Sequence, residues 1–88
     1  MDQAVILSTA RTPIGKAYRG IFNDTDAPTL ASFSIKASIE KAKLDPSEIE
    51  DVILGAAVQQ GSQGYNIGRL SAVSSGLPIH VPGMSVDR

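Results

Sequence analysis

The chain offers few residues for chemistry, and the first candidate is a glycine-containing stretch. The segment "GSQGYNIG" places Gly61, Gly64 and Gly68 after an apolar run and before a helix-like segment. Loops in this position often bind phosphate groups in α/β folds. The spacing is neither G-x-G-x-x-G nor G-x-x-x-x-G-K-[ST]. It therefore favours an ordinary turn over a nucleotide site.

A small basic cluster is the second candidate. Arg11, Lys16 and Arg19 follow the first apolar run and could meet an acidic partner or a phosphate group. Exposed basic side chains more commonly solvate a loop or pair weakly with nearby acids, here Asp24 and Asp26. We favour this second interpretation.

Metal and thiol chemistry lack their usual residues. The sequence has no cysteine and one histidine, His80. Disulfides, thiolate metal sites and cysteine nucleophiles are therefore excluded within these 88 residues, and a metal site has too few good ligands. His80 is interpreted as a residue at the edge of a strand.

Asn66 and Arg69 are spaced to act together. They lie three positions apart at the start of a predicted helix, so both side chains can project from one face. A buried or interfacial arginine needs acceptors, which helix C-terminal carbonyls or a partner subunit could supply. An exposed pair without a role is the alternative.

Charge and hydropathy exclude several classes of protein. Eight basic residues against nine acidic ones give a net charge of -1, so the chain as a whole does not attract nucleic acid or an anionic membrane. The N-terminus lacks the basic start and apolar core of a secretory signal, and no apolar run approaches the ~18 residues of a membrane span. We expect a cytoplasmic protein with no nucleic-acid or membrane partner, a mitochondrial or peroxisomal matrix being the other possibility.

The order of elements predicts an α/β fold with mostly parallel strands. Residues 4–10 and 51–58 are apolar runs typical of strands covered on both faces. Between them, residues 28–43 have the pattern of an amphipathic helix, with Asp24 to Asp26 as possible caps. A strand, helix and strand in this order predict a βαβ unit with a right-handed crossover.

The second half of the chain predicts three further elements. "DPSE" at Asp45 has the pattern of a capping box that starts one helical turn. A small-residue helix is expected over 66–75, and its composition would let a neighbouring backbone approach closely. A last strand is expected after Pro82 and Gly83.

Four stretches in combination resemble the N-terminal end of the thiolase family, and the resemblance covers essentially the whole chain. They are "VILSTARTPIGKAYRG" at 5–20, "TLASFSIKASIEKAKLDPSEIEDVILG" at 29–55, "NIGR" at 66–69 and "GLPIHVPGMSVDR" at 76–88. The resemblance implies part of the first half of an αβαβα sandwich. Residues 1–88 are then expected to be the N-terminal part of an incomplete domain.

The resemblance also implies an activity whose catalytic residues lie elsewhere. Thiolases form or cleave 3-ketoacyl-CoA, such as acetoacetyl-CoA, through an acylated cysteine. In the family that cysteine belongs to a C-[SG]-S-G motif shortly after the strand that matches "VPGMSVDR", at the N-terminus of a buried helix, where partial positive charge favours a thiolate. The expected substrate is a coenzyme A thioester, with no other cofactor, metal site or catalytic residue in this chain.

The resemblance implies structural roles for a few residues. Asn66 and Arg69 match a region near the subunit interface of the family, and the strand carrying Met84 and Val86 matches one along the dimer contact. We therefore expect a homo-oligomer, either a dimer or a tetramer, together with the remainder of a thiolase chain. Two alternatives stay open: an independent α/β binding module without catalysis, and a noncatalytic relative of the lipid-transfer type or of the ketoacyl synthase lineage.

Overall fold

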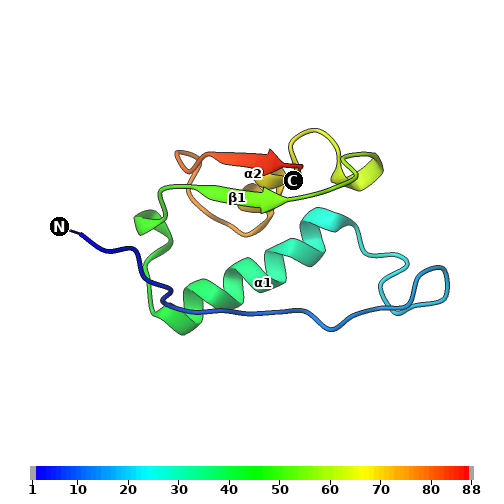
Figure 1. Ribbon diagram of the computed structural model, residues 1–88, viewed down its shortest axis with the longest axis horizontal. Coiled ribbons are helices and arrows are strands. Elements are labelled where there is room, and N and C mark those ends of the chain that lie inside the picture. Colours follow the sequence, from blue (N-terminus) through cyan, green and yellow to red (C-terminus); the bar gives the residue numbers. More distant parts are fainter. Residues whose placement is uncertain (1, 88) are drawn as a thin grey trace.

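The computed structural model describes residues 2–87. Its elements, in chain order, are α1 (Ala27–Ala42), the 3-10 turn η1 (Pro46–Glu48), β1 (Val52–Gly55), the 3-10 turn η2 (Gly61–Gln63), α2 (Ile67–Ser74) and β2 (Gly83–Val86). Helix α2 packs against both strands and against α1, and Figure 1 shows α1 on the side of the molecule away from the strands. The α/β class predicted from the sequence is confirmed.

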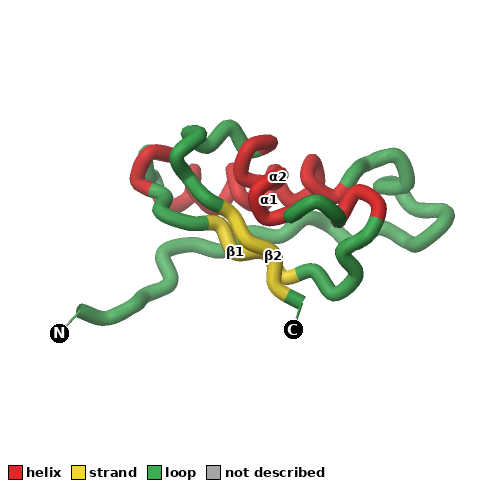
Figure 2. Tube along the Cα trace, turned by 90° about the horizontal axis from the view of Figure 1, so that it is seen from above, coloured by secondary structure: helices red, strands yellow, loops and turns green. Residues whose placement is uncertain are grey.

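The two strands form a small parallel sheet. Val52 pairs with Gly83 and Gly55 with Val86, and the Ala56 amide extends the ladder by donating to the Val86 carbonyl at 2.9 Å. The strands lie side by side in Figure 2. Because α2 connects them, the βαβ unit that forms is β1, α2, β2. The parallel pairing is as predicted, and the hand of the crossover stays a prediction.

The strand predicted at 4–10 is wrong. This segment has no strand assignment and instead runs extended along α1 (Figure 1), where Ser8 Oγ donates to the Ser38 carbonyl at 2.6 Å. Val5, Ile6 and Leu7 are 70%, 85% and 66% exposed. An apolar run supplies strand propensity, but a strand also needs a second backbone to form its ladder. The βαβ unit that was expected to join residues 4–10, α1 and β1 therefore does not form.

The strand predicted at 51–58 is shorter and less covered than expected. It is reduced to β1, whose residues alternate between half-buried and exposed, and Ile53 is 64% exposed. Alternation of this kind is typical of a sheet with one open face. The prediction that both faces are covered is wrong for the residues described.

Local signals fix the ends of α1 close to their predicted places. Asp26 accepts a hydrogen bond from the Thr29 amide at 2.8 Å, and Pro28 occupies the first turn. Both features suit a helix start, because the first amides lack partners within the helix. The helix ends at Ala42, and its C-cap Lys43 takes a left-handed conformation with φ 56°. At η1, Asp45 and Glu48 form the predicted capping box.

The core is small for a chain of this length. Ala72, Leu77 and Val81 form its buried centre, and the half-buried side chains that pack on it are Ile35, Ile39, Ile49 and Val52. The accessible surface is 6890 Å², whereas a compact monomer of this mass would expose roughly 4,900 Å². Much apolar surface therefore stays in contact with solvent.

Candidate functional site

Asn66 connects the start of α2 to β2. Its backbone is left-handed, with φ 60°, a conformation that asparagine tolerates better than most residues. Its side-chain oxygen accepts from the Arg69 amide at 3.3 Å, and its side-chain nitrogen donates to the Gly83 carbonyl at 2.9 Å. Asn66 is thus both the cap of α2 and a tie to the first residue of β2.

Ser85 completes this connection from the strand side. Its hydroxyl donates to the Asn66 side-chain oxygen at 3.0 Å and accepts from the Gly68 amide at 3.1 Å. Two residues on different elements therefore cap the same helix N-terminus. Sequence reasoning missed Ser85, because its partners lie 17 and 19 residues away and no local pattern marks them.

Arg69 fixes the loop that leads into β2. Its guanidinium donates to the Ile79 carbonyl at 3.1 Å and also to the Val81 carbonyl. The acceptors of this arginine are therefore carbonyls of the loop between α2 and β2, and not carbonyls at a helix C-terminus. We call Asn66, Arg69 and Ser85 together the α2–β2 network.

Close packing of backbones brings the members of this network together. A Cβ atom on Gly68 would lie 2.2 Å from the Met84 carbonyl oxygen, and one on Gly83 would lie 2.6 Å from the Arg69 amide nitrogen. Side chains at these positions would collide with backbone, which cannot move aside easily. The close approach is made by glycines, one in α2 and one in β2, whereas the sequence prediction rested on Ser71, Ala72, Ser74 and Ser75.

The glycine-containing stretch forms a turn, as favoured by its spacing. Gly61 begins η2 with φ 59°, and Gly68 lies within α2. At the start of α2, the Gly68 amide donates to Ser85 and the Arg69 amide donates to Asn66. A phosphate bound at a helix N-terminus needs such amides as donors, so the arrangement does not support a nucleotide site.

The other sequence candidates do not assemble into a site. Arg11, Lys16 and Arg19 are all exposed, which agrees with solvated side chains. His80 is exposed in a turn that precedes β2, so its interpretation as a residue at the edge of a strand is wrong. Within residues 2–87, no group of histidine and acidic side chains is arranged to hold a metal ion. No helix in the described part of the chain is both long and apolar enough to cross a membrane.

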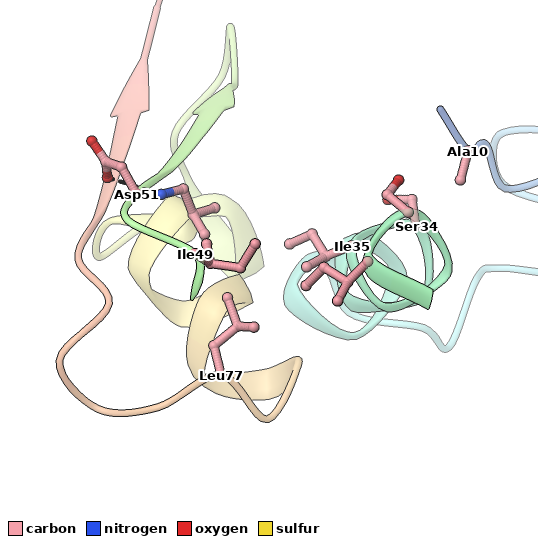
Figure 3. A pocket seen from close by; sticks show the side chains of 9 residues that line it. Ala10, Ser34, Ile35, Ile49, Asp51 and Leu77 are labelled. Atoms are coloured by element: carbon pink, nitrogen blue, oxygen red, sulfur yellow. Dashed lines mark hydrogen bonds between the residues drawn. The ribbon is translucent and has the colours of Figure 1, made fainter. Parts of the chain in front are cut away.

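One pocket of about 290 Å³ lies between α1 and the start of β1. Its lining comprises Ala10, Ser34, Ile35, Ser38, Ile39, Ile49, Asp51, Val52 and Leu77. In Figure 3, Ile35 points from α1 toward Ile49 and Leu77 on the other side. The Ser34 hydroxyl donates to the Ala31 carbonyl at 2.9 Å, and Asp51 accepts from the Val52 amide at 2.8 Å. The side chains of Ser34 and Asp51 thus bond the local backbone, and most of the lining is apolar.

Two carboxyl groups have a lowered pKa, and both cap the start of a helical segment. Hydrogen bonds from the side chain and the amide of Thr29 lower the pKa of Asp26, and hydrogen bonds from the amide and the side chain of Ser47 lower the pKa of Asp45. Donors of this kind stabilise the ionised carboxylate. These shifts report on helix starts, and neither group lines a catalytic arrangement.

The residues predicted to lie at a subunit contact occupy two settings. Met84 is 48% exposed and is paired in register with exposed Ile53, so the two side chains share the open face of the sheet. Val86 is half-buried at the end of β2. The polar atoms of Asn66 and Arg69 are bound within the chain. The predicted contact itself stays a prediction.

Comparison with known proteins places the chain in a family. The family described as "Thiolase, N-terminal domain" matches residues 4–88. The chain belongs to the thiolase family. The 3-ketoacyl-CoA thiolases of Shewanella frigidimarina and Shewanella denitrificans are 39% and 42% identical to it over 89 residues, and the acetyl-CoA acetyltransferase of Cupriavidus necator is 39% identical over 88.

These thiolase relatives are much longer than the chain. Each alignment covers 100% of this chain, but only 23% of the two Shewanella proteins and 22% of the Cupriavidus protein. The α2–β2 network therefore belongs to a segment that matches less than a quarter of each thiolase.

Proposed function

We propose that this chain is part of an acyl-CoA C-acyltransferase that forms or cleaves 3-ketoacyl-CoA. The observation that carries the proposal is the match of the whole chain to relatives named 3-ketoacyl-CoA thiolase and acetyl-CoA acetyltransferase. Residues 1–88 include no cysteine, so the nucleophile of this reaction lies outside them. The segment contributes a scaffold, and its substrate partner is a coenzyme A thioester, with no other cofactor.

The chemistry that the proposal requires can be stated in terms of atoms. In cleavage, a cysteine thiolate attacks the C3 carbonyl of a 3-ketoacyl-CoA, the bond between C2 and C3 breaks, and the released enolate of acetyl-CoA takes a proton at C2. The thiol of a second coenzyme A then accepts the acyl group from the cysteine and loses its proton. The thiolate is the reactive form of cysteine, and donors must stabilise the oxyanion that develops on the carbonyl.

Incomplete packing supports the view that residues 1–88 are part of a larger domain. The excess accessible surface and the exposed side chains of Val5, Ile6 and Ile53 are unusual for an independent domain. Expressed alone, the chain should bind a dye specific for apolar surface and elute as more than a monomer. A cooperative unfolding transition of a monomer would refute this part of the proposal.

The assembled protein is proposed to be a cytoplasmic homo-oligomer, a dimer or a tetramer. The apolar pair Ile53 and Met84 on the open sheet face supports a contact there. Light scattering of the gene product with Met84→Lys, beside the exposed control Lys16→Glu, tests the contact. Dissociation caused by the Met84 variant alone agrees with it, whereas an unchanged mass contradicts a contact at this face.

The sequence of the gene after Arg88 and an activity assay test the function. A C-[SG]-S-G motif shortly after Arg88, together with coenzyme A-dependent loss of acetoacetyl-CoA by the gene product, would support an acyltransferase. The cysteine-to-alanine variant of that motif is the control and should be inactive. A different residue at the cysteine position, or a gene product that lacks this activity, would favour a noncatalytic relative.

A further inference from the structure

We propose that residues 14–23, which we call the tip loop, bind an anionic lipid surface. The exposed apolar side chains of the loop enter the headgroup layer, and Arg11, Lys16 and Arg19 lie against its negative charge. The inference does not depend on the proposed function, because a contact at a membrane surface is compatible with any activity of the gene product.

The tip loop is ordered by its own contacts. The Asn23 side chain donates to the Tyr18 carbonyl at 2.6 Å and accepts from the Gly20 amide at 3.1 Å. A Cβ atom on Gly20 would lie 2.1 Å from the Lys16 carbonyl oxygen, so the two arms of the loop touch through their backbones. Compact loops of this kind frequently have a function, and the tip loop presents a preformed surface.

That surface is apolar and lies at one end of the molecule. Ile14, Tyr18 and Ile21 are 97%, 95% and 78% exposed, and Tyr18 has a left-handed backbone with φ 66°, which bulky residues rarely adopt. The loop lies beyond the start of α1, at the right-hand end of the long axis in both views (Figure 1 and Figure 2), along which the molecule measures 47 Å. A projecting apolar tip can enter a lipid headgroup layer without a matching cavity, which a protein partner would need.

The charge of the chain is divided between two regions. Residues 3–23 contain three basic residues and no acidic one, whereas the rest of the chain has five basic and nine acidic residues. The net charge of -1, which predicts no membrane partner, is therefore the sum of +3 and -4. Basic side chains beside exposed apolar ones are typical of surfaces that bind anionic lipid. Nucleic acid would contact the basic side chains but would leave Ile14 and Ile21 without a role.

Two acidic residues follow the tip loop. The Asp26 carboxylate accepts from the Thr29 amide at 2.8 Å, so it is engaged at the start of α1. Asp24 is exposed directly after the loop and repels an anionic surface. Asp24→Asn should therefore bind anionic vesicles more tightly than wild type, and weaker binding would contradict the placement of the loop at the lipid.

Cosedimentation of the gene product with lipid vesicles tests the proposal. Vesicles of phosphatidylcholine and phosphatidylglycerol in equal parts should bind the protein at least about tenfold more tightly than vesicles of phosphatidylcholine alone. Sodium chloride at about 1 M should remove this difference, because the screening length falls to about 3 Å. Absence of binding to the mixed vesicles, or equal binding to both kinds, would overturn the proposal.

Charge variants locate the contact. Each basic residue near an anionic surface is worth about fivefold in affinity, so Lys16→Gln combined with Arg19→Gln should weaken binding to the mixed vesicles about 25-fold. The matched control, Lys36→Gln combined with Lys43→Gln, removes the same charge from exposed positions and should change the affinity less than about twofold. Equal weakening by the two pairs would show attraction by net charge alone and would overturn the proposal.

Apolar variants test whether the tip enters the lipid. Ile14→Ser combined with Ile21→Ser keeps the charge of the loop and should weaken binding to the mixed vesicles at least about tenfold. An unchanged affinity would show that the loop does not insert. Both side chains are exposed, so these substitutions remove no packing within the described residues.

Iodination of Tyr18 by lactoperoxidase shows what covers the tip loop. Tyr18 should react in the free gene product and should be protected by the mixed vesicles. The reactivity of Tyr65, which is also 95% exposed, should not depend on vesicles. A Tyr18 that does not react in the free gene product would mean that other parts of the protein or a second copy cover the loop, and would overturn the proposal. Equal protection of both tyrosines would contradict a contact through the tip loop.

Discussion

Replacing Gly68 by alanine tests the packing of α2 on β2, because two effects of opposite sign compete. In an exposed helix, alanine is about 1 kcal/mol more favourable than glycine. At Gly68, however, the new Cβ would lie 2.2 Å from the Met84 carbonyl oxygen. This distance is 1.2 Å short of the 3.4 Å at which ordinary contact begins, so β2 or α2 must shift.

The magnitude follows from the contacts that such a shift disturbs. Overpacking typically costs about 1–3 kcal/mol, and the backbone obstacle at Met84 places this case near the upper end. Loss of the hydrogen bond from the Gly68 amide to Ser85 adds about 1 kcal/mol. After the gain in helix propensity is subtracted, the free energy of unfolding should fall by about 3 kcal/mol.

Urea denaturation of the gene product, followed by circular dichroism, measures this change as a lower midpoint at an unchanged slope. Gly55→Ala is the matched control, because no atom lies within 4 Å of the Cβ position there. It should stay within about 0.5 kcal/mol of wild type. A Gly68→Ala variant as stable as wild type, or more stable, would refute the close packing of the two backbones.

Three further predictions concern single side chains. Arg69→Lys should lower the free energy of unfolding in urea by about 1–2 kcal/mol, because one ammonium group does not reproduce the two donors that reach two carbonyls. The control Arg11→Lys, at an exposed position, should leave the free energy of unfolding unchanged. Asp26 has a lowered pKa in the folded chain. Its stabilising effect is therefore fully present above pH 3.8, the ordinary pKa of the group, and is lost as the pH falls through the lower pKa of the folded state. Asp26→Asn caps without titrating, and its melting temperature should therefore fall less than that of wild type on acidification; equal falls would contradict the assignment. Among residues 2–87, the buried Ser71 hydroxyl has no hydrogen-bond partner. Ser71→Ala should therefore be neutral or stabilising by about 1 kcal/mol in thermal unfolding, and a clear loss of stability would contradict the absence of a bond.

Elements with local signals were predictable from the sequence. The start of α1 depends on Asp26 and Pro28, and η1 depends on the box of Asp45 and Glu48. In each case the side chain binds an amide two or three residues away, so the pattern is readable in a short window. A helix expected over 66–75 and a strand expected after Pro82 also form, as α2 and β2.

Features that depend on distant partners were not predictable in the same way. The run at 4–10 has the composition of a strand, yet nothing within it says whether another backbone will pair with it. Ser85 takes part in two of the three hydrogen bonds that Asn66 and Gly68 make with β2, and its neighbours in sequence give no sign of this. The candidate residues Asn66 and Arg69 were found from their spacing, but their partners, carbonyl groups at 79, 81 and 83, became visible only in the structure.

The most direct test of the central claim is the site of acylation in the gene product. After incubation with acetyl-CoA, peptide mass spectrometry should find one acetyl group on a cysteine outside residues 1–88, and iodoacetamide should prevent its formation. An unmodified protein, or an acetyl group found only on a lysine or serine within residues 1–88, would contradict the account.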